Sequence, residues 1–213
     1  MIKKFSLVAV AALLTAFNAN AGSSWYVGFD VHQSKLDLDS NIDSAATVSS
    51  GVKKLDDTGA GVSIFLGRQI NSWLALEFSG SSDHVDLLDY ENYYNSGSSY
   101  EYALYRANIY SFGVSSKVSY NTAFQLSLYA KPGLGYTITD LELNGGASDP
   151  NYKVDIDEKN TTLHFNFEIG AEYFLTDSFS ASVAYERRFD AVDVPNVDEM
   201  SQDLIKGGIR YHF

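Results

Sequence analysis

Apolar and polar residues alternate along much of the chain with a period of two. In residues 25–32, aromatic and aliphatic side chains occupy every odd position, and the even positions are mostly small or polar. Successive side chains of a β-strand point to opposite faces, so this period indicates a strand. Seven further stretches repeat the pattern, and together they predict eight strands: 25–32, 60–67, 74–79, 110–118, 124–134, 163–173, 179–186 and 205–213.

The connections between these stretches alternate between long and short. The long ones are residues 35–57, 82–102, 137–160 and 190–202, and the short ones are 70–72, 120–122 and 175–178. Barrels of the outer membrane have tight turns at one rim and long loops at the other. Within a bilayer, the sheet must close on itself so that no backbone amide lacks a partner. We therefore predict an all-β fold, an eight-stranded antiparallel transmembrane β-barrel with short periplasmic turns and four long extracellular loops.

The first residues are typical of an export signal. Lys3 and Lys4 precede an apolar run from Phe5 to Phe17, and Ala19 and Ala21 form an A-x-A cleavage pattern. The run is shorter than the roughly 20 residues of a membrane-spanning helix. We expect a signal peptide over residues 1–21, cleaved on export to the outer membrane of a Gram-negative bacterium, and a barrel domain over residues 22–213. A buried helix is the alternative interpretation of this run.

Composition narrows the classes of partner. The sequence has no Cys, so disulfides cannot hold the fold, and closed strand ladders must do so. The net charge of −12 argues against nucleic acid as a partner, because phosphate binding needs clustered bases. Aromatic residues predict two interfacial girdles, a feature that the core of a soluble β-protein could also produce. The first comprises Trp25, Trp73, Tyr120, Tyr173, Tyr211 and Phe213, and the second Tyr110, Tyr136 and Tyr185.

Three stretches resemble the OmpA-like and OmpX-like families of eight-stranded outer-membrane barrels: residues 67–77 (GRQINSWLALE), 129–136 (YAKPGLGY) and 170–177 (GAEYFLTD). The ending, with Ile209, Tyr211 and Phe213 on one face, resembles the signal that such barrels present to the outer-membrane assembly machinery. Because the sequence stops at Phe213, we expect no peptidoglycan-binding domain of the OmpA kind. The resemblance implies outer-membrane lipid and lipopolysaccharide as surroundings.

The strand pattern also predicts a charged interior. Five acids and five bases occupy the alternate strand positions whose side chains are expected to point into the barrel. They are Asp30, Glu77, Lys117, Lys131, Glu168, Glu172, Glu186, Arg188, Lys206 and Arg210. An eight-stranded barrel is only wide enough for side chains to fill it, so the simplest expectation is a paired polar plug. Family precedent keeps open a gated pathway in which the pairs exchange partners.

No motif supports catalysis or metal binding. His32 and Ser34 have the His-x-Ser spacing of a lipid A deacylase family, but nothing places a carboxylate beside them, and we expect a water-exposed rim histidine. Asp37, Asp39, Asn41 and Asp43 copy the first spacings of a calcium loop, whose turn glycine and closing glutamate are missing. We predict no catalytic residue, no metal and no cofactor.

The long connections suggest where function resides. They are rich in acids, and residues 82–102 add Tyr90, Tyr93, Tyr94 and Tyr100 among Ser, Asn and Gly. Tyr and Ser make adaptable contact surfaces, although such loops also suit a life beside lipopolysaccharide. We favour a non-catalytic barrel with a role in envelope integrity or in contact with a host-cell or phage surface. A small-solute channel of the OmpW-like type is one alternative, disfavoured by the charged lumen, and a lipid-modifying enzyme is another.

Overall fold

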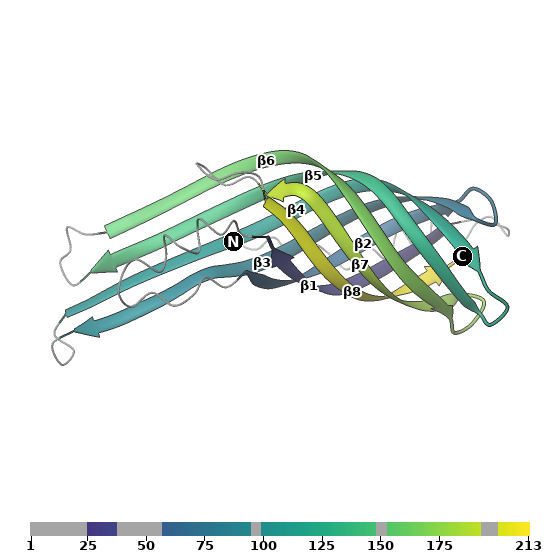
Figure 1. Ribbon diagram of the computed structural model, residues 1–213, viewed down its shortest axis with the longest axis horizontal. Coiled ribbons are helices and arrows are strands. Elements are labelled where there is room, and N and C mark those ends of the chain that lie inside the picture. The colour runs from purple at the N-terminus through teal and green to yellow at the C-terminus, as the bar shows by residue number, and fades with distance from the viewer. Residues whose placement is uncertain (1–24, 38–56, 95–98, 148–152, 193–199) are drawn as a thin grey trace.

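The computed structural model describes residues 25–37, 57–94, 99–147, 153–192 and 200–213, so the expected signal peptide lies outside the described residues. Eight strands form a closed barrel in which each pairs antiparallel with the next and β1 pairs with β8, as predicted (Figure 1). They are β1 (Trp25–Leu36), β2 (Thr58–Gln69), β3 (Leu74–Tyr94), β4 (Ser99–Asn121), β5 (Leu126–Ala147), β6 (Lys153–Phe174), β7 (Phe179–Val192) and β8 (Met200–His212). Within the described ranges, no helix has the length and apolarity to cross a membrane.

The two faces of the sheet differ in chemistry. Apolar side chains cover the outside, among them Phe29, Ile64, Phe112, Leu134 and Ile209, and each of these is exposed. Polar and charged side chains from the alternate positions fill much of the inside. This distribution is the reverse of a soluble barrel and matches a lipid-facing surface.

Three tight connections, residues 70–73, 122–125 and 175–178, form one rim of the barrel, which we call the turn rim. Each contains a side chain that bonds the backbone of the turn. Asn71 Oδ1 accepts hydrogen bonds from the amides of Trp73 and Leu74, at 3.0 and 2.9 Å. Thr122 Oγ1 donates to the Leu126 carbonyl, and Thr176 Oγ1 accepts from the Phe179 amide. Local side-chain bonds of this kind stabilise short turns, and outer-membrane barrels place such turns on the periplasmic side.

The opposite rim differs from the prediction of irregular loops. Strands β3 to β6 run for 21 to 23 residues, against 12 to 14 for the other four. Residues 82–94, 99–102, 137–147 and 153–160, predicted as loops, therefore belong to paired strands. The parts that extend beyond β2 and β7 form what we call the protruding sheet, residues 86–94, 99–106, 142–147 and 153–164, which stands out at the left of Figure 1.

An apolar cluster closes the interior at the base of the protruding sheet. We call it the apolar cap, and its members are 4% exposed or less: Leu36, Val85, Leu87, Ala107, Ile109, Leu141, Ala191, Val192 and Met200. Tyr105 packs against it, and burial, with the nearby Glu158 carboxylate, raises the pKa of this phenol. The alternation of apolar and polar residues gives no sign of the cap, because most of its members come from stretches predicted as loops.

Candidate functional site

The structure places all ten residues of the expected charged network inside the barrel. Each is 8% exposed or less. They come from seven of the eight strands: β1 and each of β3 to β8 have at least one charged residue among the positions that face the interior. A buried charge is costly unless it is paired, so the contacts decide whether this arrangement is stable.

Near the turn rim, two carboxylates organise the charges. Glu77 Oε2 accepts from Lys131 Nζ at 2.8 Å, and its Oε1 accepts from the Tyr26 hydroxyl at 2.6 Å. Glu172 pairs with Lys117 and, at 2.8 Å, with Arg210. Its other oxygen contacts His212 Nε2 at 3.2 Å and accepts from the Ser180 hydroxyl. Both carboxylates therefore have partners for both oxygens.

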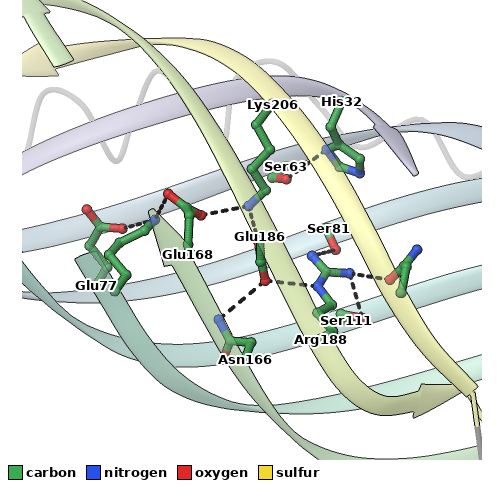
Figure 2. A network of polar contacts seen from close by, with 12 residues as sticks. His32, Ser63, Glu77, Ser81, Ser111, Asn166, Glu168, Glu186, Arg188 and Lys206 are labelled. Carbon is green, nitrogen blue, oxygen red and sulfur yellow. Dashed lines mark hydrogen bonds and ion pairs between the residues drawn. The ribbon is translucent and has the colours of Figure 1, made fainter. Parts of the chain in front are cut away.

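In the middle of the barrel, acids and bases alternate in a chain (Figure 2). Lys131 lies 2.9 Å from Glu168, and Glu168 lies 3.1 Å from Lys206. Lys206 pairs in turn with Glu186, which accepts from Arg188 Nε at 3.0 Å. Each charged residue in this row of ion pairs has at least two partners of opposite charge. Removal of one residue therefore changes the pairing of its neighbours.

Asp83, which lies beneath the apolar cap, is a further member of the charged network, from a stretch predicted as a loop. Its carboxylate lies 2.7 Å from His32 Nε2 and 3.6 Å from Arg188 Nη1. The expectation that His32 is an exposed rim residue is wrong: it is 5% exposed, because β1 and β3 continue past it and bury it against Asp83. Its Nδ1 is 3.3 Å from the Ser63 hydroxyl, whereas the Ser34 hydroxyl is buried without a hydrogen-bond partner among the described residues.

Asp30 differs from the other nine expected members, because each of those forms a direct ion pair and Asp30 forms none within the described part of the chain. It packs against Gly208, where a methyl group would overlap its carboxylate. With Asp83 included, the described residues place six buried acids and five buried Lys or Arg residues in the interior.

Aromatic rings packed against glycines occupy the rest of the half of the interior nearest the turn rim. The rings of Tyr26, Phe65 and Tyr129 lie directly against lumen-facing glycines, Gly67, Gly28 and Gly170 respectively. Cationic groups lie over the same rings: the Arg210 guanidinium is 5.1 Å from the centroids of Phe65 and Tyr129, and Lys117 Nζ is 4.7 Å from that of Tyr129. Cation–π contacts of this kind stabilise buried bases. No sequence signal distinguished these glycines from the others.

The Gly67 contact gives a stability prediction. We expect Gly67→Ala to lower the free energy of unfolding of the refolded barrel by about 1–3 kcal/mol, because the new methyl group overlaps the Tyr26 ring and displaces it from Glu77. Gly207→Ala is the matched control, since nothing lies within 4 Å of its added methyl group. Denaturant unfolding in detergent or lipid measures both variants, and equal stability of the two would contradict a packed ring.

One small cavity lies among the polar side chains of the interior. A polar cavity with about 20 Å³ of room for solvent lies beside Ser63, Ser81, Ser111, His164 and Arg188. That volume is enough for about one water molecule. The cavity lies below the apolar cap and among the ion pairs, so it is a gap in the polar packing rather than a binding pocket for a substrate.

Other expected residues lie on the outer surface. Trp73, Tyr120 and Tyr173 are exposed near the turn rim, and Tyr110, Tyr136 and Tyr185 are exposed toward the opposite rim. In the expected assembly signal, Ile209 is exposed on the lipid side of the barrel. The rings of Tyr211 and Phe213 pack edge to face, with their centroids 5.1 Å apart. Tyr90, Tyr93, Tyr94 and Tyr100 lie on the paired ends of β3 and β4, where the side chains are outside the described residues.

Comparison with known proteins supports the same architecture. Residues 5–213 match the family described as outer membrane protein beta-barrel domain. Neisserial surface protein A is 18% identical with a TM-score of 0.51, and the alignment covers 91% of this chain and all of that one. Ail, the attachment invasion locus protein of Yersinia pestis, is 14% identical with a TM-score of 0.54 and the same coverage. No curated protein sequence matches significantly.

The family match spans nearly the whole sequence, and the outward apolar face with its closed ladder is what that family requires. The chain therefore belongs to the outer membrane protein beta-barrel domain family. Its similarity to these two proteins establishes a shared fold.

Proposed function

We propose that this barrel is a non-catalytic contact protein of the bacterial surface, exported through a signal peptide that is cleaved after Ala21 and inserted by the outer-membrane assembly machinery. The protruding sheet is the observation that carries this proposal. It continues four paired strands past the rest of the barrel, and outer-membrane barrels place their long connections outside the cell. Ail, whose name describes attachment and invasion, is one of the solved barrels of similar fold.

Charge on the protruding sheet favours contact with water and polar partners rather than lipid. Its acids outnumber its bases, with Asp86, Asp89, Glu91, Glu101, Glu142, Asp155, Asp157 and Glu158 against Arg106, Lys153 and Lys159. One cross-strand row places Asp86, Arg106, Glu142 and Asp157 side by side. Arg106 Nε donates to Asp86 at 2.9 Å. A paired sheet holds the backbone of these residues in a fixed register, as a recognition surface requires.

The interior supports a role without transport or catalysis. Ion pairs fill the lumen and the apolar cap closes it below the protruding sheet, so a solute would have to displace both. Ser63, His32 and Asp83 contact one another in the order of a hydrolytic triad, but they lie beneath the cap beside a cavity of one-water size. An ester or amide substrate has no room there. We therefore propose that contact occurs on the protruding sheet, beside lipopolysaccharide.

A trimmed variant tests the proposal. The residues Leu88, Tyr105, Leu143 and Ile156 form one row across β3 to β6. Replacing residues 88–105 and 143–156 by short Gly/Ser turns cuts the sheet along this row and keeps the cap. We expect the variant to insert and to remain heat-resistant as a folded barrel, and to lose most of the binding of whole bacteria to host cells or phage.

Two measurements on this variant separate the alternatives. Planar-bilayer recording should show no conductance before or after trimming, because the cap and the ion pairs remain. Unchanged adhesion of the trimmed strain, at equal surface amounts, would overturn the contact proposal, and an ion current from the untrimmed barrel would favour the channel.

A further inference from the structure

Four polar side chains cluster on the outer side of the barrel where the protruding sheet begins. We call them the outer cluster: His84 and Asp86 of β3, and Arg106 and Asn108 of β4. Asn108 is the direct cross-strand partner of His84, and Arg106 is that of Asp86. The side chains of His84, Asp86 and Arg106 are 52, 54 and 43% exposed. On β4 the cluster follows the exposed Tyr110, so it lies at the outer border of the lipid-facing surface, where water reaches it.

The position of the outer cluster coincides with a change in how β3 is held. Val85 is the last residue of β3 that pairs with β2 within the described ranges, and the pairing with β4 shifts between Asp86 and Leu88. Beyond this point β3 keeps β4 as its neighbour, and in Figure 1 this part of β3 forms the lower border of the projecting strands. Val85 and Leu87 point to the opposite side, into the apolar cap. Side-chain contacts of the outer cluster therefore act at the joint between the barrel and the protruding sheet.

The imidazole ring of His84 lies between two oxygen atoms. Its Nδ1 is 2.8 Å from Asn108 Oδ1, and its Nε2 is 3.4 Å from Asp86 Oδ1. Arg106 Nε donates to the same Asp86 oxygen at 2.9 Å. A neutral imidazole carries one N–H, whereas the imidazolium carries two. The protonated ring therefore donates to the Asn108 amide oxygen and attracts the Asp86 carboxylate at the same time, whereas a neutral ring satisfies only one of these oxygens.

The charged groups around the ring are mostly acidic. They are Asp86 on β3, Arg106 on β4, and Asp140 and Glu142 on β5, the next strand. On β2 the facing residue is the uncharged Ala60. Histidine is the side chain that ordinarily changes its charge between about pH 5 and about pH 8. A proton on this ring therefore changes both the contacts of the joint and the charge of a largely acidic surface.

We propose that His84 is a proton-operated clip that fastens β3 to β4 at the base of the protruding sheet. With the proton bound, the ring joins Asp86 of β3 to Asn108 of β4 beside the register shift. As the pH rises and the proton leaves, one of the two contacts is lost, and the border of the sheet opens more often. The protruding sheet is therefore held more firmly, and binds its surface partner more tightly, at acidic pH. The inference rests on the proposed contact function and adds its regulation.

Hydrogen exchange of the full-length barrel in nanodiscs measures the clip directly. We compare peptides that cover residues 84–88 and 105–109 at about pH 5.5 and about pH 7.5, after correction for the intrinsic pH dependence of exchange. The wild type should open these segments about two- to fivefold less often at the lower pH, as expected for one partly exposed ionic contact. Peptides from the paired part of β5 and β6, residues 128–136 and 163–171, serve as an internal reference and should not change.

Three variants separate the clip from other effects of pH. His84→Gln keeps a polar side chain that does not take up a proton, and it should show equal opening at both pH values. Asn108→Asp places a second carboxylate against the ring and should extend the firm state toward the higher pH. His212→Gln is the matched control, because it removes a histidine at the turn rim and should leave the pH dependence of the two segments unchanged. Heat-modifiability on gels shows whether each variant is folded.

Adhesion of whole bacteria to host cells or phage connects the clip to the contact function. At equal surface amounts, the wild type should bind about twofold better or more at the lower pH, and His84→Gln should bind equally at both. His84→Lys keeps a positive charge at both pH values without the two-sided geometry of the ring. If this variant binds at the higher pH as the wild type does at the lower, with no gain in protection, charge alone acts and the clip is overturned.

Two other results would overturn the clip: equal opening of the wild type at both pH values, and an unchanged pH dependence in His84→Gln. The trimmed variant described above keeps the whole outer cluster, so the two proposals can fail separately. Loss of adhesion on trimming, together with pH-independent opening in the wild type, retains the contact function and removes the clip. Unchanged adhesion on trimming, together with pH-dependent opening, retains the clip and removes the contact function.

Discussion

Glu77→Ala should lower the free energy of unfolding of the refolded barrel by about 3 to 5 kcal/mol, the range for a buried ion pair that loses one partner. Glu77 is 1% exposed and bonds both Lys131 and the Tyr26 hydroxyl. The truncated side chain leaves a buried ammonium with Glu168 as its remaining direct partner, and a phenol without an acceptor. Equilibrium unfolding in urea, followed by tryptophan fluorescence in lipid vesicles, measures the change.

Two comparisons show whether the loss comes from the buried pair. Glu142→Ala removes an exposed carboxylate and should change stability by less than about 0.5 kcal/mol. Glu77→Leu combined with Lys131→Met removes both charges and should recover part of the loss. Recovery should be incomplete because Lys131 also pairs with Glu168. Equal stability of Glu77→Ala and the wild type would mean that water reaches this carboxylate.

Deletion of Phe213 should remove most of the protein from the outer-membrane fraction. The Phe213 amide donates to the Trp25 carbonyl at 3.1 Å, so this residue extends the seam between β1 and β8 at the turn rim. It also supplies the aromatic end of the expected assembly signal, together with Ile209 and Tyr211. Cell fractionation and heat-modifiability on gels measure the folded, inserted amount.

Phe213→Tyr serves as the control for that deletion, because it keeps both the backbone bond and an aromatic ring. We expect near-normal amounts of this variant. Normal accumulation of the protein that lacks Phe213 would show that assembly does not use this residue. Equal loss of both variants would show that assembly requires the phenylalanine ring itself, and that an aromatic residue with the same backbone bond is not sufficient.

Within the membrane-facing part of the barrel, the sequence pattern predicts the structure closely. One face of each strand meets lipid and the other meets packed polar groups. Polar residues such as Glu77 and apolar residues such as Ile209 therefore occupy alternate positions wherever a strand crosses that region. The ten charged residues at the alternate positions of β1 and of β3 to β8 that the pattern assigned to the interior are buried in the structure. Their individual partners could not be predicted, since the register between distant strands decides which base reaches which acid.

Beyond that region the pattern disappears while the strands continue. Residues 86–94 read Asp-Leu-Leu-Asp-Tyr-Glu-Asn-Tyr-Tyr, without alternation, and pairing with β4 rather than lipid contact defines them as a strand. This is why Asp83 and the apolar cap were missed and His32 was placed at an exposed rim. The glycine contacts with Tyr26 and Phe65 were missed for a related reason, because they join positions on neighbouring strands.

The apolar cap has a consequence for the cell as a whole. The lumen charges other than Asp30 form ion pairs below it, and the members of the cap come from the ends of β1, β7 and β8 as well as from β3 to β5. Under the contact function proposed above, a barrel filled in this way would add no leak to the membrane in which it sits. Its copy number could then rise with the demand for surface contacts while the permeability barrier of the envelope stays constant, which is a freedom that open pores do not have.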